Sequence, residues 1–465
     1  MRPPLLEGAL DSAATTGEGR QTRRFLILLL CFLTLSFFTF GTYKNWPYKV
    51  ESDGKYYYQF LVSGFYDHDF DFANNYRVPK PARMRMEIDH YNLRYAVDPI
   101  TGKPKNLWTI GPALLWLPFF TVAVGCATVL LACGVSVDPN PWGTYFQYFT
   151  MFAAVIYTTI TAHLLSRLLA RHFATETSRT AVWVILVSTN WYYYTVFEPS
   201  LSHVYDLFTF VAYLAVFDLC SRRRRLLDYL GLAALGGLHV LVRTQNIVPI
   251  GLFSALLAVR TLSQRDRRSL QLLLGYATAL LVALSPLLLT NISLSGRPFA
   301  VAQGQQFFDF THPKVVEVLF SFRNGLFSHH PVLLLGAMGY FGFFMHVKRS
   351  GDRQPTALLL ALAIAFALQT YVNSIALDWW SGHSFGQRRL MSSYPLFTYG
   401  IAYMIQRGQA SFQKLTGFAL VAFSASGLLL TGIHVFLWSY DQPHNIAAWL
   451  FYHAPLAIGR YLTRF

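Results

Sequence analysis

The chain contains a long succession of apolar runs, most of them close to the length that a helix needs to cross a bilayer. A crossing helix requires about 20 predominantly apolar residues. The first run covers 25–42, and the others follow at intervals along the chain: 145–169, 180–197, 203–220, 227–242, 246–261, 270–292, 330–346, 356–375, 391–406 and 413–435. This pattern predicts an all-α polytopic membrane protein with about eleven transmembrane helices.

The composition supports a membrane protein. Charged residues make up 13% of the 465 residues and hydrophobic residues 54%, whereas a typical soluble domain carries about 25% charged residues. These values exclude an ordinary soluble enzyme and a disordered chain. The four Cys lack the spacing of a metal site or of a disulfide framework, so neither is expected.

The net charge of +15 would indicate a nucleic-acid partner in a soluble protein. Here the basic residues gather between alternate apolar runs, which is the positive-inside distribution of membrane proteins. The clusters are Arg167 to Arg179, Arg222 to Arg225, Arg260 to Arg268, Lys348 to Arg353, and Arg407 with Lys414. We therefore expect membrane lipids rather than nucleic acid as partners and a C-terminus outside. Residues 1–24 should form a cytoplasmic tail, disordered over 1–20.

The apolar stretch 110–132 would reverse this orientation if it crossed the membrane, because every later basic cluster would then lie outside. We expect it to lie in the outer interface or to re-enter, which Pro112 and Pro118 permit. A twelfth crossing is the alternative topology. The first external loop, 43–144, is then the longest, and 294–329 and 376–390 form two further external loops.

Acidic residues of the first external loop are candidates for chemistry. Asp53 lies in a Ser-Asp-Gly sequence, where an ionised carboxylate could accept a proton from an incoming hydroxyl, although the same sequence suits a turn before a helix. Asp67, Asp69 and Asp71 alternate with other residues, so an extended segment would place them on one face. They form either an oxygen-rich cation site or the polar face of a loop folded onto the membrane. His383 is a further candidate for a metal or acceptor site.

Glu198 and His203 lie in the short loop that follows the run 180–197. Ionisable residues at membrane depth are costly, and they are functional candidates by default. A simple helix end would explain Pro199 and Ser202 as breaker and N-cap, but it would not explain the carboxylate or the imidazole.

Four arginines lie in expected external segments, namely Arg243, Arg323, Arg388 and Arg389. The planar guanidinium is well suited to bind an anion. Because three separate segments place Arg near the headgroups, a lipid that carries a phosphate is one explanation. Simple attraction to the headgroups is the other.

The order of these features resembles the GT-C superfamily of integral membrane glycosyltransferases. The resemblance rests on the following segments: Ser52-Asp53-Gly54, Ile110-Gly111-Pro112, Arg179-Thr180-Ala181, Glu198 to His203, and the run from Gly236-Gly237-Leu238 to Val242-Arg243. It covers most of the first 260 residues by layout. It implies a GT-C-like transmembrane core over 25–262 and a variable C-terminal transmembrane region over 263–465. This chain has Gly54 where many members continue an acidic pair.

The resemblance implies a transferase that moves a hexose or pentose from a polyprenyl-phosphate donor to a glycan or lipid acceptor. Asp53 would be the general base, with Glu198 and His203 as further catalytic candidates. Arg243, Arg388, Arg389 and Arg323 would bind the donor phosphate. The reaction would invert the anomeric carbon and require no cofactor, although the acidic cluster leaves a divalent cation open. The active site would face outward, in a bacterial inner membrane.

Two other classes remain as alternatives. A transporter of lipid-linked sugars should show repeats and many charges deep in its spans, whereas His163, Asp206 and His239 are the few deep titratable residues here. An oligosaccharide polymerase or ligase shares the lipid-phosphate donor and external arginines, but such enzymes usually keep their largest external loop in the C-terminal half.

Overall fold

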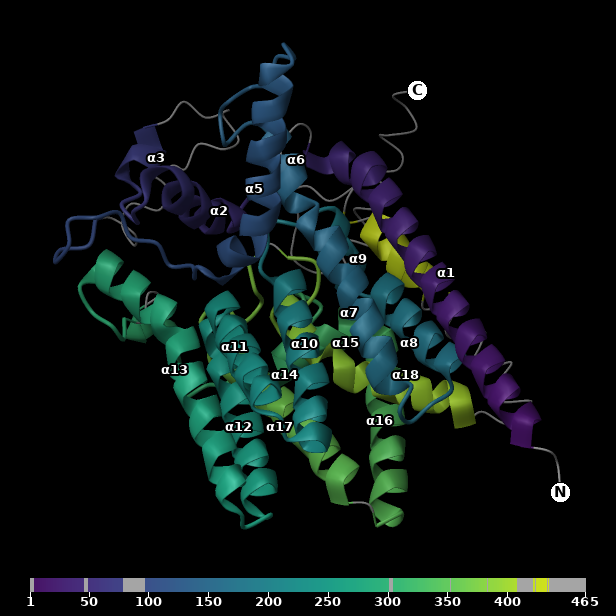
Figure 1. Ribbon diagram of the computed structural model, residues 1–465. Helices are drawn as coiled ribbons and strands as arrows, with labels where there is room; N and C mark the ends of the chain where they lie inside the picture. Colours follow the sequence, from purple (N-terminus) through teal and green to yellow (C-terminus); the bar gives the residue numbers. More distant parts are fainter. Residues whose placement is uncertain are drawn as a thin grey trace.

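The computed structural model describes residues 4–45, 49–77, 97–300, 304–351, 353–382, 384–407, 421–422, 424–432 and 434. These residues form helices joined by turns and loops (Figure 1). Within the described ranges, β pairing is limited to the isolated bridges Val97–Pro104 and Phe308–Ala376. The all-α fold class expected from the apolar runs is confirmed.

The helices follow one another in chain order, with a π-helical turn at Ser63–Asp67 and a 3₁₀ helix at Arg388–Ser393 that matter for the site. The first group is α1 (Pro4–Asn45), α2 (Gly54–Val62), α3 (Ala73–Arg77), α5 (Gly111–Ala132), α6 (Thr144–Met151), α7 (Ala153–Leu169), α8 (Thr175–Ser188) and α9 (Asn190–Val196). The second group is α10 (His203–Arg223), α11 (Leu226–Val242), α12 (Ile247–Leu262), α13 (Arg267–Ser295), α14 (Val315–Phe320), α15 (Leu326–His329), α16 (Pro331–Arg349), α17 (Arg353–Ser374) and α18 (Tyr394–Arg407).

Eight helical stretches in the described part of the chain are long and apolar enough to cross a membrane. The chain is therefore a multi-pass integral membrane protein. Seven of the eight coincide with expected spans, and the eighth is α5. The count of eleven stays a prediction, because α11 and α18 are shorter and most of 413–435 lies outside the described residues.

The expected span 180–197 is divided in two at Thr189. Its backbone is extended (φ −130°, ψ 177°), and its hydroxyl accepts a hydrogen bond from the backbone N–H of Trp191 at 3.3 Å. The next residue, Asn190, donates to the carbonyl of Phe385 at 2.9 Å and accepts from the hydroxyl of Tyr394. Side-chain hydrogen bonds thus replace part of the broken helical ladder, and they tie α9 to the loop that precedes α18.

The expectation of a disordered N-terminal tail is wrong for residues 4–20, because α1 begins at Pro4 and runs for 42 residues without interruption. Starting a helix is costly, but extending one is cheap. The apolar segment of α1 supplies the start, and the preceding residues continue it.

Helix α5 stands above α11 in Figure 1 and does not run beside it. A Cβ on Gly111 would overlap the backbone of Leu241, so α5 begins where α11 ends. From there α5 runs antiparallel to α7 and α6, since Tyr157 donates to the Leu115 carbonyl at 3.0 Å and Tyr145 to the Ala123 carbonyl at 3.1 Å. Because α5 is itself long and apolar enough to cross a membrane, the expected interfacial placement of 110–132 stays a prediction.

Candidate active site

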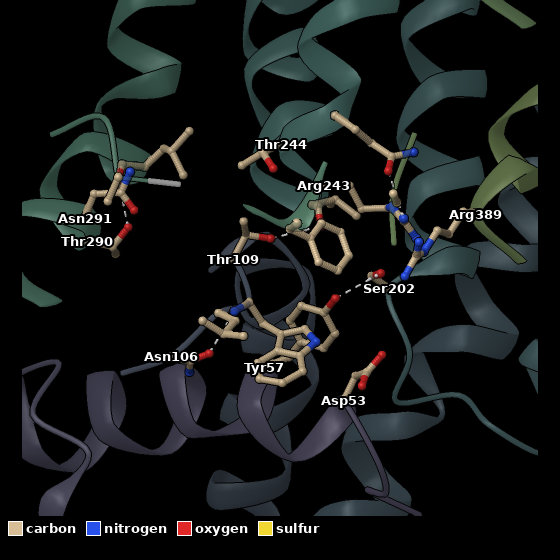
Figure 2. A pocket seen from close by; sticks show the side chains of 18 of the residues that line it. Asp53, Tyr57, Asn106, Thr109, Ser202, Arg243, Thr244, Thr290, Asn291 and Arg389 are labelled. Atoms are coloured by element: carbon tan, nitrogen blue, oxygen red, sulfur yellow. Dashed lines mark hydrogen bonds between the residues drawn. The ribbon is translucent and has the colours of Figure 1, made fainter. Parts of the chain in front are cut away.

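A cavity of about 410 Å³ lies where the starts of α2 and α10, the ends of α11 and α17, the C-terminal part of α13 and the 3₁₀ helix Arg388–Ser393 meet. Its size is typical of a small-molecule site. Among the described residues that line it, the carboxylate is that of Asp53 and the cations are Arg243, Arg388 and Arg389. Figure 2 shows Asp53 and Tyr57 on one side of the cavity, with Arg243 and Arg389 opposite them.

Asp53 immediately precedes α2, as a helix-capping residue would, yet its carboxylate makes no capping hydrogen bond. Its Oδ2 instead accepts from the guanidinium of Arg388 at 3.1 Å. The start of α2 lies very close to Ser200, and this contact depends on Gly54, because a Cβ at position 54 would overlap Ser200. The start of α2 can therefore pack against the loop between α9 and α10, which directs Asp53 into the cavity.

Arg388 is buried, with 8% of its surface exposed. Burial alone would lower its pKa, but the negative charges of Asp53 and Glu198 outweigh burial, and the pKa lies above the ordinary value of arginine. Arg388 is therefore a permanent cation beside the carboxylate. The phenol of Tyr57, which donates to Ser202 at 3.2 Å, stays neutral because burial, with a contribution from Asp53, raises its pKa to about 12.

Arg388 and Arg389 are the first two residues of the 3₁₀ helix Arg388–Ser393, directly after the loop that follows α17. Arg389 forms a bidentate ion pair with Asp378, with one N–O distance of 2.8 Å. Gln387 donates to the carbonyl of Trp379 at 2.9 Å and accepts from the hydroxyl of Ser381. These contacts fix the loop, and with it the two arginines that follow, before any ligand binds.

Arg243 directly follows α11, and His203 begins α10. The Nη1 of Arg243 lies 2.7 Å from the Nδ1 of His203, and its Nη2 donates to the Oε1 of Gln245 at 3.1 Å. Both residues line the cavity. The structure thus brings together Asp53, His203, Arg243, Arg388 and Arg389, which the sequence had placed in four separate segments.

Other candidates lie away from the cavity. Glu198 is not among the residues that line it and accepts a hydrogen bond from the hydroxyl of Tyr193 at 2.8 Å. Arg323 does not line it either, because its guanidinium packs over the ring of Trp380, 3.9 Å from the centroid. His383 lies outside the described residues.

The expected extended segment with three aspartates on one face is wrong. The chain forms a π-helical turn at Ser63–Asp67 and turns back at His68, whose φ is +56°. Phe60 stacks edge-on against Phe72, which favours this compact loop. Asp69 accepts from Ser63 at 3.1 Å. In the described chain no group of three or more His, Cys, Asp and Glu could hold a metal ion. Asp67, Asp69 and Asp71 do not gather into such a group there, and a divalent cation stays a prediction.

Sequence reasoning missed most of the neutral side chains of the cavity, among them Asn106, Thr109, Gln245, Asn291 and Asn373. A polar residue at the end of an apolar helix is common and carries no signal by itself. Gln245, two residues after Arg243, could have been found by asking what pairs with an arginine at that depth.

The fold of this chain is shared with solved membrane enzymes. No protein-family model and no curated protein sequence matches the chain. ArnT from Cupriavidus metallidurans in the apo state is similar, with 14% identity, coverage of 96% of this chain and 70% of ArnT, and a TM-score of 0.55. The ArnT structure bound to undecaprenyl phosphate gives 14% identity, 93% and 69% coverage, and a TM-score of 0.53.

A third similar structure is the archaeal oligosaccharyltransferase AglB from Archaeoglobus fulgidus, with 11% identity, coverage of 90% of this chain and 56% of AglB, and a TM-score of 0.47. The likeness to ArnT shows that this chain has the fold of the GT-C glycosyltransferases. The resemblance inferred from the sequence layout is confirmed at the level of the fold.

Proposed function

We propose that the chain transfers a sugar from a polyprenyl-phosphate donor to an acceptor hydroxyl on the extracytoplasmic side of a membrane. The observation that carries the proposal is the cavity that joins Asp53 to three arginines within a GT-C fold. A carboxylate beside several cations suits a reaction in which a hydroxyl loses a proton while a phosphate leaves. ArnT, whose fold is similar, binds undecaprenyl phosphate, which is a lipid phosphate of the class proposed here.

The two oxygens of Asp53 have different environments. Oδ2 accepts from Arg388, whereas Oδ1 has no hydrogen-bond partner among the described residues. Oδ1 would take the proton of the acceptor hydroxyl while the hydroxyl oxygen attacks the anomeric carbon. The bond between that carbon and the phosphate oxygen breaks, and the phosphate leaves with the electron pair. A single displacement of this kind inverts the configuration of the sugar.

Replacing Asp53 tests the proposal. Asp53→Asn keeps the shape of the side chain and an acceptor for Arg388, but it removes the base, so transfer should fall by about 100-fold or more. The assay uses the full-length protein in nanodiscs with a panel of undecaprenyl-phosphate sugars and a lipid extract as acceptor. It measures the release of undecaprenyl phosphate by mass spectrometry.

Asp67→Asn is the matched control, since Asp67 lies in the same external segment but is exposed and outside the cavity. The control should transfer sugar at the wild-type rate. If Asp53→Asn retained full activity, Asp53 could not be the base. If the wild-type protein released undecaprenyl phosphate from none of the donors, the proposed function itself would be wrong.

A further inference from the structure

The contacts of Arg243 determine the protonation of its neighbour. A guanidinium carries only N–H donors. The Nδ1 of His203, 2.7 Å from Nη1 of Arg243, must therefore accept this hydrogen bond. An imidazole whose Nδ1 accepts is neutral and carries its proton on Nε2. Arg243 thus fixes His203 in the Nε2–H form.

The Nε2–H group of His203 is available to a ligand. His203 is buried, with 4% of its surface exposed, and it lines the cavity. Nε2 has no hydrogen-bond partner within the part of the chain that the structure describes. It is also not among the described side-chain atoms that are fully buried without a partner. The group is a donor that reaches the cavity beside Arg243.

A chain of side-chain amides leads from the other side of Arg243 to a buried carboxylate. Gln245 accepts from Arg243 and donates to Gln369 at 3.0 Å. Gln369 donates to the Oδ1 of Asn246 at 3.3 Å, and Asn246 donates to the Oδ1 of Asp206 at 2.5 Å. The two ends of this amide chain fix the direction of hydrogen-bond donation along it, because Arg243 can only donate and an ionised Asp206 can only accept.

The chain of side-chain amides lies between the negative charge of Asp206 and the cavity. Asp206 is fully buried and does not line the cavity. Arg388 and Arg389 each contact a carboxylate, whereas no carboxylate in the described residues lies within ion-pair distance of Arg243. Arg243 is held by two neutral acceptors, so its charge is not cancelled by direct contact.

We propose that Arg243 and His203 bind the donor phosphate together, Arg243 as the cation and His203 as a neutral hydrogen-bond donor through Nε2–H. Asp206 is the positioning residue of this pair and acts through the three amides. This inference rests on the proposed function, because it names how the same cavity holds its lipid phosphate. It also gives His203 a role other than that of a general base.

Two substitutions of His203 separate the two nitrogen atoms. His203→Asn keeps an acceptor for Arg243 near the Nδ1 position but has no donor at the Nε2 position. His203→Gln reaches the Nε2 position with an amide donor. The probe is undecaprenyl phosphate, titrated into the purified full-length protein in detergent, with binding measured by thermophoresis.

We expect His203→Asn to raise the Kd by about 10-fold or more, as for a lost hydrogen bond to a charged group. His203→Gln should stay within about threefold of the wild type, and His312→Asn, on an exposed loop, should bind as the wild type. Equal Kd values for His203→Asn and His203→Gln, whether unchanged or equally weakened, would overturn the donor role of Nε2–H.

The positioning role of Asp206 has its own test. Asp206→Asn removes the acceptor-only group that fixes the far end of the amide chain, and Gln369→Met interrupts the amide chain at its centre with a side chain of similar length. Both should raise the Kd, by roughly threefold to tenfold, the scale of one hydrogen bond. Gln369→Met provides the measurement if Asp206→Asn does not fold. Unchanged Kd in the folded variants would overturn the positioning role. A cooperatively melting wild-type protein that did not bind undecaprenyl phosphate would instead refute the proposed function.

Discussion

At the scale of single residues, Lys49 shows how a buried charge joins three parts of the chain. Lys49 is 1% exposed, and its ammonium donates to the carbonyls of Gly41, four residues before the end of α1, and of Val196, at the end of α9. It also lies 4.4 Å from the centroid of the Phe37 ring. Burial lowers the pKa of Lys49 to about 7, although Glu51 opposes this shift.

The lowered pKa of Lys49 predicts that stability rises with pH. Between pH 7 and the ordinary value of 10.5, the unfolded chain holds a proton that the folded chain lacks. The free energy of unfolding therefore increases with pH across this window, by up to about 2 to 3 kcal/mol between pH 7 and pH 9. Thermal melts of the wild type and of Lys49→Met in detergent should diverge over this interval. Parallel curves for the two proteins would contradict the prediction.

At the same scale, the charged residues of the cavity could be predicted from the sequence as site residues, whereas most of its neutral residues could not. Asp53, Arg243 and Arg388 were found because a charge at the end of an apolar run requires a partner or a ligand. Their pairing could not be predicted, since Asp53 and Arg388 are 335 positions apart. Beyond Gln245, the amide chain could not be predicted, because Gln369 in α17 and Asp206 in α10 meet the 3₁₀ helix Thr244–Asn246 only once these elements have packed.

At the scale of helices, α16 and α18 pack through glycines. A Cβ on Gly400 would overlap the backbone of Gly336 and Tyr340, and a Cβ on Gly339 would overlap the carbonyl of Gly400. The two backbones therefore approach closely, as small residues allow in membrane proteins. The contact matters for the site because α18 directly follows the 3₁₀ helix that carries Arg388.

We expect Gly400→Ala to destabilise the protein by about 1 to 3 kcal/mol through overpacking, and to lower transfer activity by displacing Arg388. Thermal melting and the undecaprenyl phosphate release assay measure the two effects. Gly251→Ala in α12 is the matched control, because nothing lies within 4 Å of its added Cβ. A Gly400→Ala protein that melted and reacted like the control would show that the helices can shift without disturbing the site.

The boundaries of the helices were predictable where an apolar run is followed or preceded by charged residues. They were less predictable where contacts with distant parts of the chain determine the end of a helix. The run 270–292 corresponds to α13, which Asp266 caps by accepting from the N–H of Ser269 at 2.7 Å. The run 180–197 gave no sign of its break at Thr189, because the residues that replace the lost helical bonds come from 385 and 394. The loop after α2 was misjudged for the same reason.

At the scale of the whole molecule, the position of α5 decides which side of the membrane the cavity faces. The helix is apolar, and Val122, Val129 and Leu131 are exposed on it. If α5 lies in the outer interface, every basic cluster between the later spans remains on one side, and the cavity faces the other. If α5 crosses the bilayer, its end at Ala132 is separated from Asp53 by the membrane.

Native cysteines allow the two arrangements to be distinguished. Cys133, directly after α5, is exposed. In a protein that keeps Cys133 but has Ser at positions 31, 126 and 220, a membrane-impermeant maleimide added to intact cells should label Cys133, because the end of α5 and the cavity share the outer side. A cysteine introduced by Ser350→Cys, between α16 and α17, should react only after permeabilisation. If Cys133 also required permeabilisation, α5 would cross the bilayer. Either Asp53 would then lie on the cytoplasmic side, or the later basic clusters would lie outside.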